Sequence, residues 1–378
     1  MSGEDRGAAA VGFLIIDKPS GVTSFAMVSL VRRLTGVRRV GHAGTLDPLA
    51  SGVLPMAIGA ATRLIEYLDD TPKVYLARVR FGVSTDTYDA EGAITSERDA
   101  SSVTREAVEP LLPSFTGDIV QQPPRFSALK VAGKPLYRYA REGADVEAAP
   151  RRVRVERIAL QSCSGGEAEI EVACGKGTYI RSLAHDLGEA LGCGAHLAAL
   201  RRTASGGFTA ADAHTPDELR AAHEGGWLTE LLLAPDRAVE RRPAAILDAQ
   251  HTADVREGRD IVARPRREAD RCRAYGADGL FLGVLAHAGE GRWHPEKMLV
   301  RASSGRICPF FPRSRQIHIR FTRSALDNAR GGSIIRSGRI RVARSAYLLM
   351  RIGLWDVASE SSTEDCLGSV LLEVPNAA

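Results

Sequence analysis

Segments with the periodicity of strands and segments with the periodicity of helices alternate along the first 240 residues, and this alternation restricts the fold most. Residues 74–82 alternate apolar and polar side chains, which predicts a half-buried strand. Residues 12–18 predict another strand that enters a Pro/Gly turn. An amphipathic helix follows, with Thr23 or Ser24 as its N-cap. The first 240 residues show no internal repeat, so they are expected to mix strands and helices without a repeat architecture.

Composition places the chain among ordinary globular proteins. With 378 residues, two to three domains are expected. Hydrophobic residues make up 44% and charged residues 25%, which excludes a collagen, a mucin or a wholly disordered chain. The apolar runs are far shorter than the roughly 18 residues that span a bilayer, and residues 1–18 do not resemble a secretory signal. We therefore expect a cytoplasmic protein without membrane segments.

The cysteines and the charge distribution exclude some site types. Six cysteines are scattered without any C-x-x-C pair, which argues against a zinc site and against a disulfide framework. Residues 301–378 hold 12 Arg and 6 Asp or Glu, a net charge of +6, which leaves about −2 for residues 1–300. The overall basic character therefore belongs to the tail, and nucleic-acid binding by the main body must depend on local patches.

Changes in composition divide the chain. Residues 117–142 are rich in Pro and Gly with interleaved cations and aromatic residues, which predicts a projecting insertion. A boundary is expected near residues 240–243, followed by a small strand-rich module with hairpin turns at Asp278-Gly279 and at residues 289–291. Beyond residue 301 the apolar periodicity is poor, and disorder is expected.

Residues 38–55 (RRVGHAGTLDPLASGVLP) form the most informative stretch. Three glycines allow backbone conformations that other residues avoid, and Pro48 keeps Asp47 out of the helical region. Asp47 is therefore predicted on a shaped loop, five residues after His42. An alternative is that Asp47 caps a helix that begins at Pro48. On its own, His42 is more often structural than functional.

Six further blocks accompany GHAGTLDPLASGVLP, and together they resemble the TruB family of tRNA pseudouridine synthases. In chain order they are DKPSGVTS, KVYLARVRFG, TDTYDAEG, QQPPRFSALKVAGKPLYRYAREG, GKGTYIRSLAHDLG and LRRTASGGF. The resemblance covers residues 11–300.

The resemblance implies a fold, a division and an activity. The fold would be α+β, with a mixed, largely antiparallel central sheet flanked by helices and loops, and a small β-rich PUA-like C-terminal domain. Residues 11–240 would form the catalytic domain, with an RNA-gripping insertion at 117–143, and residues 241–300 the PUA-like domain, followed by a tail outside the family pattern. The implied activity is isomerisation of uridine 55 in the tRNA T-loop to pseudouridine, by base flipping and an aspartate nucleophile.

The family's catalytic residues correspond to three positions here. Asp47 corresponds to the nucleophile, whose carboxylate is ionised at neutral pH without special tuning. Arg181 corresponds to the arginine that pairs with this carboxylate, and Tyr75 to the tyrosine that stacks on the target base. From spacing alone, Tyr75 reads more simply as an inward-facing aromatic of a strand.

Substrate-binding positions carry over in the same way. His42 corresponds to the residue that fills the space left by the flipped base. Tyr179, expected to alternate with Arg181 on one strand face, corresponds to a substrate contact, and Leu200 to an apolar wall that could equally be core. Two departures are Arg63, where many members have Lys, and Phe126, where Tyr is usual. The remaining RNA contact is expected at Lys130.

The resemblance also implies partners, and the residues leave alternatives open. The expected partner is the T-arm and T-loop of tRNA, without guide RNA, without a membrane, and with the protein as a monomer; no metal and no cofactor is expected. A second hypothesis keeps the chemistry but requires guide RNA, and a third is an RNA-folding chaperone without catalysis. A hydrolase that pairs Asp47 with Asp86 or Asp89 has little support, because sequence cannot place these groups at the separation that glycosidases need.

Overall fold

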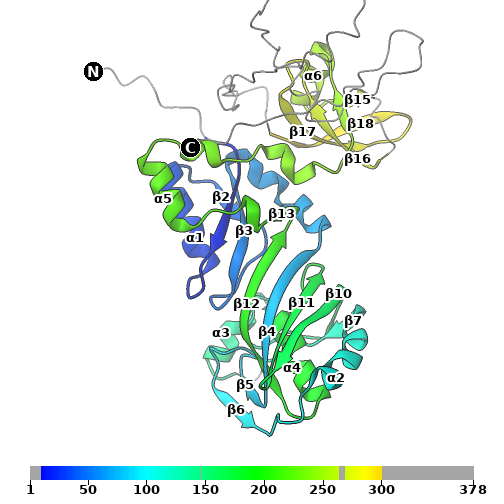
Figure 1. Cartoon of the computed structure of the whole chain (residues 1–378). Coiled ribbons are helices and arrows are strands. Elements are labelled where there is room, and N and C mark those ends of the chain that lie inside the picture. Colours follow the sequence, from blue (N-terminus) through cyan, green and yellow to red (C-terminus); the bar gives the residue numbers. More distant parts are fainter. Residues whose placement is uncertain (1–9, 145, 264–268, 300–378) are drawn as a thin grey trace, which may run out of the picture. The chain divides into compact units, whose positions relative to one another are not determined.

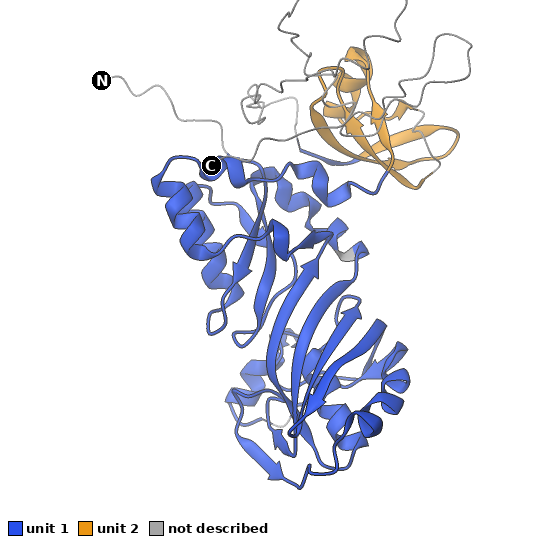
Figure 2. Ribbon diagram, in the orientation of Figure 1, with its two compact units in different colours: residues 1–242, 296–308 blue, residues 243–295, 309–378 orange. Residues whose placement is uncertain are grey.

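The computed structural model describes residues 10–144, 146–263 and 269–299. The tail from residue 301, expected to be disordered, lies outside these residues. The chain divides into two compact units, of which unit 1 contains residues 1–242 and 296–308, and unit 2 contains residues 243–295 and 309–378 (Figure 2).

Unit 1 is built on a nine-stranded sheet with the order β1-β3-β12-β4-β11-β10-β7, in which β2 pairs with β3 and β13 with β12 (Figure 1). All pairs are antiparallel except β3 with β12. The strands are β1 Gly12–Lys18, β2 Val40–His42, β3 Ser51–Ile58, β4 Lys73–Phe81, β7 Gly117–Gln121, β10 Arg151–Ser164, β11 Glu167–Cys174, β12 Ala195–Ser205 and β13 Phe208–Thr209. The prediction of a mixed, largely antiparallel sheet is confirmed.

Two short hairpins complete the strands of unit 1. They are β5 Val83–Thr85 with β6 Ile94–Glu97, and β8 Lys130–Val131 with β9 Lys134–Pro135. The expectation that residues 117–142 project from the core is wrong for the first five of them, because β7 pairs with Arg151–Val155 of β10 at the end of the main sheet. That pairing joins segments about thirty residues apart, which local composition does not reveal.

Five α-helices and five 3-10 helices surround the sheet of unit 1. They are α1 Ser24–Thr35, α2 Arg105–Val108, α3 Leu136–Arg141, α4 Ile180–Ala190, α5 Pro216–Glu224, η1 Gly59–Asp70, η2 Glu109–Phe115, η3 Ala210–Asp212, η4 Leu228–Leu231 and η5 Pro235–Val239. Helices α1 and α5 contact each other and β1, whereas α4 packs on β12 and β4. None of the helices among the described residues is long and apolar enough to cross a bilayer.

Helix α1 shows how the sequence sets these boundaries. The Thr23 side chain accepts a hydrogen bond from the Ala26 amide at 3.1 Å, so the predicted N-cap is confirmed. The helix ends at Gly36, whose φ of 68° suits glycine, and the Gly36 amide donates to the Arg32 carbonyl. Its apolar face joins the main core, where Leu14, Ile16 and Leu54 are fully buried.

Unit 2 contains the predicted strand-rich module. Its five-stranded sheet has the order β14-β16-β17-β18-β15. The elements are β14 Ala244–Ile246, α6 Ala249–Arg256, β15 Ile261–Val262, β16 Arg271–Tyr275, β17 Phe281–His287 and β18 Arg292–Met298, of which the last three residues are assigned to unit 1. The predicted hairpin turns lie between β16 and β17 and between β17 and β18.

Candidate active site

Asp47 lies on the loop between β2 and β3, and this loop is anchored on both sides of the aspartate. The Ser24 hydroxyl accepts from the Leu46 amide and donates to the Leu46 carbonyl, both at 2.9 Å. On the other side, the Gly21 amide donates to the Pro48 carbonyl at 2.8 Å. No helix begins at Pro48, so the alternative of Asp47 as a helix cap is wrong.

A buried arginine lies beside the Asp47 carboxylate. Arg181 Nε is 3.0 Å from Asp47 Oδ2, and the exposed fractions of the two side chains are 6% and 41%. The Nε hydrogen is not aligned with the carboxylate, so the contact is an ion pair rather than a directed hydrogen bond. The structure therefore places a fixed cation beside the carboxylate and leaves part of the carboxylate open to solvent.

The other nitrogens of Arg181 are fixed by the protein. Nη1 donates to the Thr87 carbonyl at 3.1 Å and Nη2 to the Phe126 carbonyl at 3.0 Å. Nη1 also lies 3.4 Å from Oδ2 of Asp89, whose side chain is only 5% exposed. A guanidinium held at this many points has little freedom to move when the substrate arrives.

The sequence did not predict that Asp89 would pair with Arg181. The Thr87 hydroxyl donates to Asp89 Oδ1 at 2.7 Å, and the Glu91 amide donates to the same oxygen at 3.0 Å. Asp86 instead accepts from the Ala93 amide within its own turn. Because Arg181 stands between Asp47 and Asp89, these carboxylates form an arginine-bridged pair, which does not favour the hydrolase alternative. The only sequence signal was the cluster of Asp and Thr in TDTYDAEG.

Tyr75 and Leu200 lie on the neighbouring strands β4 and β12, where both are more than nine-tenths buried. Burial raises the pKa of the Tyr75 phenol, and the nearby Arg202 guanidinium opposes this rise. The negative charge of Asp47 also raises the pKa of the Tyr75 phenol, so the two side chains share one electrostatic environment. The interpretation of both residues as inward-facing core side chains is compatible with these positions.

His42 ends β2, five residues before Asp47. Burial lowers the pKa of its imidazole, and the Arg202 charge lowers it further. Its Nδ1 atom is buried without a hydrogen-bond partner among the described residues. The imidazole is therefore neutral at neutral pH, and its Nδ1 atom is available for a further hydrogen bond.

Tyr179 does not lie on a strand face with Arg181. Arg181 is the second residue of helix α4, and Tyr179 is the extended residue before that helix. The Gln121 side chain fixes this turn, because its amide nitrogen donates to the Tyr179 carbonyl and its oxygen accepts from the Tyr179 amide, at 2.9 and 2.8 Å. The expected strand pattern is thus corrected to the start of a helix.

The remaining predicted residues have diverse environments. Phe126 is half-buried, and its backbone carbonyl is what contacts Arg181. Lys130 is exposed at the start of β8. Arg63, in η1, donates to the Met298 carbonyl of unit 1 at 2.6 Å, which gives this side chain a partner within the protein.

Two buried cations near the loop were also missed. Lys18 is fully buried, and its Nζ donates to the carbonyls of Pro19, Val22 and Pro48 at 2.9, 2.7 and 3.3 Å. Burial lowers the pKa of Lys18 to about 8, although the Asp47 charge opposes this shift. Arg202 is also fully buried. Two of the Lys18 partners are within four residues, but Pro48 and the partners of Arg202 are distant in sequence, and local patterns do not reveal those contacts.

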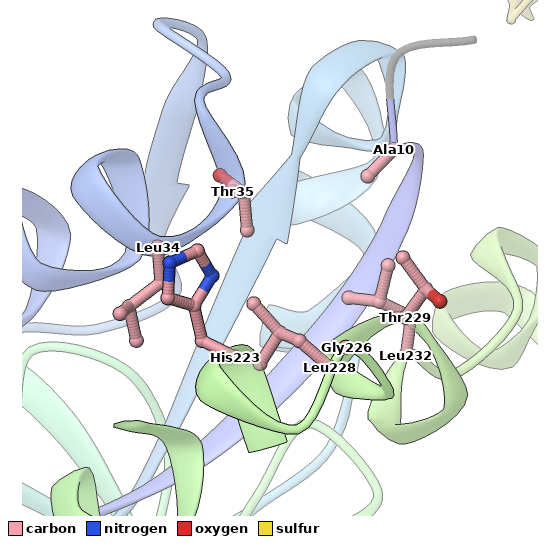
Figure 3. A pocket seen from close by; sticks show the side chains of 8 residues that line it. All are labelled: Ala10, Leu34, Thr35, His223, Gly226, Leu228, Thr229 and Leu232. Atoms are coloured by element: carbon pink, nitrogen blue, oxygen red, sulfur yellow. The ribbon is translucent and has the colours of Figure 1, made fainter. Parts of the chain in front are cut away.

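Two cavities in unit 1 are lined by none of the predicted site residues. A cavity of about 180 Å³ lies among α1, α5 and η4, next to Leu34, His223 and Leu228 (Figure 3). A second, of about 450 Å³, is bordered by Lys18 and by the Asp17–Arg201 ion pair. Neither is lined by Asp47, Tyr75 or Arg181. Over residues 10–299, apart from 145 and 264–268, no group of three or more His, Cys, Asp or Glu side chains is arranged to hold a metal ion.

Comparison with known sequences assigns the chain to a family. Residues 32–180 match the profile described as TruB family pseudouridylate synthase (N terminal domain), and residues 181–240 match that of the tRNA pseudouridylate synthase B C-terminal domain. The tRNA pseudouridine synthase B of Dehalococcoides mccartyi strain CBDB1 is 42% identical over 292 residues, which are 77% of this chain and 97% of that protein. The enzyme of the same name from Burkholderia pseudomallei strain 668 is 45% identical over 296 residues, 76% and 97% of the two chains.

Solved structures agree on the fold. A Cbf5-Nop10-Gar1 complex contains a chain that matches with a TM-score of 0.60 at 24% identity, over 80% of this chain and 92% of that one. An H/ACA RNP bound to a substrate RNA containing 2'-deoxyuridine gives a TM-score of 0.59 at 24% identity, over 78% and 86% of the two chains. These likenesses support the α+β fold with a β-rich C-terminal unit. On the strength of the sequence matches, the chain belongs to the TruB family and is a tRNA pseudouridine synthase.

Proposed function

We propose that the chain isomerises uridine 55 in the T-loop of tRNA to pseudouridine, without guide RNA and as a monomer. The observation that carries this proposal is the contact between Asp47 and Arg181. A half-exposed carboxylate on an anchored loop, with a buried guanidinium 3.0 Å away, is a group held ready to react at the surface. The protein's membership of the TruB family supports the same assignment.

Asp47 is the nucleophile in this proposal. In the isomerisation the C1′–N1 bond of the nucleoside breaks and a C1′–C5 bond forms, while C5 loses a proton and N1 gains one. No atom or electron is gained overall, so an attacking carboxylate and a path for one proton are sufficient. Arg181 orients the carboxylate, because the guanidinium lies 3.0 Å from it and several contacts fix the position of that guanidinium. Asp89 in turn holds Arg181.

The apolar side chains next to the loop form the base pocket. Tyr75 and Leu200 provide the aromatic face and the apolar wall against which the flipped uracil lies. Taking a base out of the RNA stack costs a few kcal/mol. We assign to His42 the role of stacking in the vacated space, which suits a neutral imidazole with one free nitrogen. Tyr179, at the start of α4, contacts the same nucleotide.

The grip on tRNA comes from residues 121–143. This segment contains the β8–β9 hairpin and helix α3, and its exposed surface carries Lys130, Arg138 and Arg141. Cations interleaved with aromatic residues suit an irregular RNA loop, where phosphates and unstacked bases are both accessible. Phe126 contributes an aromatic face to this surface. Arg63 lies outside this segment, in η1, and we assign to it a separate RNA contact.

The test uses purified protein, with EDTA and no added cofactor, and an unmodified T-arm transcript in which pseudouridine is mapped by chemical adduct formation and reverse transcription. The expected result is one stop, at the uridine that corresponds to position 55. A matched transcript with cytidine at that position gives no stop. Tight binding without product would instead support the guide-dependent or the chaperone hypothesis, and a stop at another uridine would refute the assignment of the position.

A further inference from the structure

Arg202 is a buried cation without a carboxylate partner. Its side chain on β12 is fully buried, and no acidic group among the described residues forms an ion pair with it. A buried charge is costly unless other groups compensate for its lost hydration. Because Arg202 is buried at this cost beside the Asp47 loop, we ask which groups of that loop it binds.

The contacts of Arg202 reach both arms of the Asp47 loop. Nε donates to the Val53 carbonyl at 2.7 Å, and Nη2 donates to the Gly44 carbonyl at 3.0 Å. Gly44 precedes Asp47 by three residues and Val53 follows it by six. One planar guanidinium therefore joins the segment before Asp47 to the segment after it, which we call the two arms of the loop. Only a forked donor can do so with two nitrogens.

The backbone of Arg202 strengthens this connection. Arg202 pairs with Gly52 of β3 in the parallel register and with Tyr75 of β4 in the antiparallel register. Gly52 has a φ of 100°, and a Cβ atom placed there would lie 2.2 Å from the Arg202 carbonyl oxygen. The close approach of β3 to β12 therefore requires glycine at position 52. Through these pairings one residue links the loop strand to the strand that carries Tyr75.

The charge of Arg202 also acts on the groups around it. It opposes the burial that raises the pKa of Tyr75, and it lowers the pKa of His42. Its Nη1 atom is buried, has no hydrogen-bond partner in the part of the chain that the structure describes, and lies next to Gly44, where an added Cβ would meet it at 3.2 Å. The guanidinium thus lies close to Tyr75 and His42 and contacts the loop that carries Asp47.

We propose that Arg202 is a positioning residue, which clamps the two arms of the Asp47 loop to β12 and so fixes Asp47 relative to Tyr75. It does not touch the substrate, since its side chain has no exposed surface. The proposal rests on the proposed function in one respect, namely that Asp47 and Tyr75 are the groups whose relative position matters.

The chain supplies a matched control at the adjacent position. Arg201 is on the same strand, but its side chain is 41% exposed and makes two hydrogen bonds to Asp17, at 3.1 and 2.8 Å. Its side chain has the same chemistry and it pairs with the same two strands, β3 and β4, but the hydrogen bonds of its side chain go to Asp17 and not to the loop. Any effect of losing an arginine from β12 in general would therefore appear at Arg201 as well.

The experiment compares Arg202→Met and Arg202→Lys with Arg201→Met and the unaltered enzyme. Three quantities are measured: the single-turnover rate at saturating T-arm transcript, the Kd for that transcript, and amide hydrogen exchange of peptides from residues 41–55. For Arg202→Met we expect the rate to fall by roughly 100-fold, as for loss of a group that preorganises a site, with a Kd within about threefold. Exchange in the loop peptides should rise, and Arg202→Lys should recover part of the protection and part of the rate.

Each outcome has a definite meaning. A normal rate with unchanged loop exchange in Arg202→Met would overturn the proposal, as would an equal loss in Arg201→Met. If Arg202→Met does not fold, Arg202→Lys, which keeps the charge, replaces it with the same expectations at smaller size. If the unaltered enzyme makes no pseudouridine, the proposed function fails, whereas loop exchange still tests the clamp.

Discussion

The Asp47 loop and the insertion of residues 121–143 are stabilised in opposite ways. Around the loop, buried cations bind backbone carbonyls that are distant in sequence, as Arg181 does with Thr87 and Arg202 with Val53. In the insertion the cations interact with near neighbours and stay at the surface, as when Lys134 pairs with Glu142 and lies 4.5 Å from the centre of the Tyr139 ring. Under the proposed function, we expect the loop to be a rigid region for chemistry and the insertion an adaptable one for holding RNA.

Among the residues that hold Asp47 in place, the largest effect is expected at Arg181, which makes several contacts in the rigid region. Arg181→Lys keeps the charge but cannot reach Asp47, Asp89 and two carbonyls together, so we expect the single-turnover rate to fall by roughly 100-fold or more. The Kd for tRNA should change by less than about threefold. An equal loss of affinity and rate would contradict the division between chemistry and binding.

Asp89→Asn tests the buried carboxylate that pairs with the same arginine. The variant keeps the size of the side chain but leaves the buried Arg181 with less compensating charge. We expect a rate loss of roughly 10-fold to 100-fold, and a lower midpoint in urea unfolding. Asp86→Asn is the matched control, because Asp86 lies in the same turn and its carboxylate accepts a hydrogen bond from the Ala93 amide instead of pairing with Arg181. A larger effect at Asp86 than at Asp89 would refute this arrangement.

Lys18 gives a prediction about pH. Its folded-state pKa of about 8 lies below the ordinary value of 10.5, so between these values the unfolded chain binds more protons than the folded one. Stability should therefore rise with pH in this window, by up to about 1.4 kcal/mol per unit. Urea unfolding at pH 7.5 and 9.5 measures this, and Lys18→Met should lack that part of the rise. An identical pH dependence in both proteins would contradict the burial of this ammonium group.

The smallest effect is expected in the insertion. Lys130→Glu should weaken tRNA binding several-fold and reduce the slope of log Kd against log salt concentration by about one, as loss of one phosphate contact does. The single-turnover rate at saturating tRNA should stay within about twofold. A rate loss comparable to that of Arg181→Lys would place the insertion in the rigid region instead.

Local signals in the sequence predicted the parts of the fold that depend on neighbouring residues. Thr23 was expected as a helix cap and is one, and residues 74–82 were expected as a half-buried strand and form most of β4. The mixed sheet followed from the family resemblance and is confirmed. The placement of Asp47 on a non-helical loop followed from Pro48 and the surrounding glycines, and the structure agrees.

Long-range contacts explain what could not be predicted. The strand assigned to Tyr179 and Arg181 was wrong because alternation over three residues does not distinguish a strand from the start of a helix, and Gln121, distant in sequence, fixes that turn. Asp89 and Arg202 gain their positions from partners more than ninety residues away. A charged residue with such partners looks like a solvated surface residue in the sequence.

In the proposed function the Asp47 carboxylate performs the chemistry while other groups hold the RNA. The single-turnover rate of pseudouridine formation by Asp47→Asn at saturating T-arm transcript, together with the Kd of this variant, tests that division. We predict a rate loss of roughly 10⁴-fold or more with the Kd within about threefold. A rate within tenfold of the unaltered enzyme would contradict the assignment of Asp47 as the nucleophile.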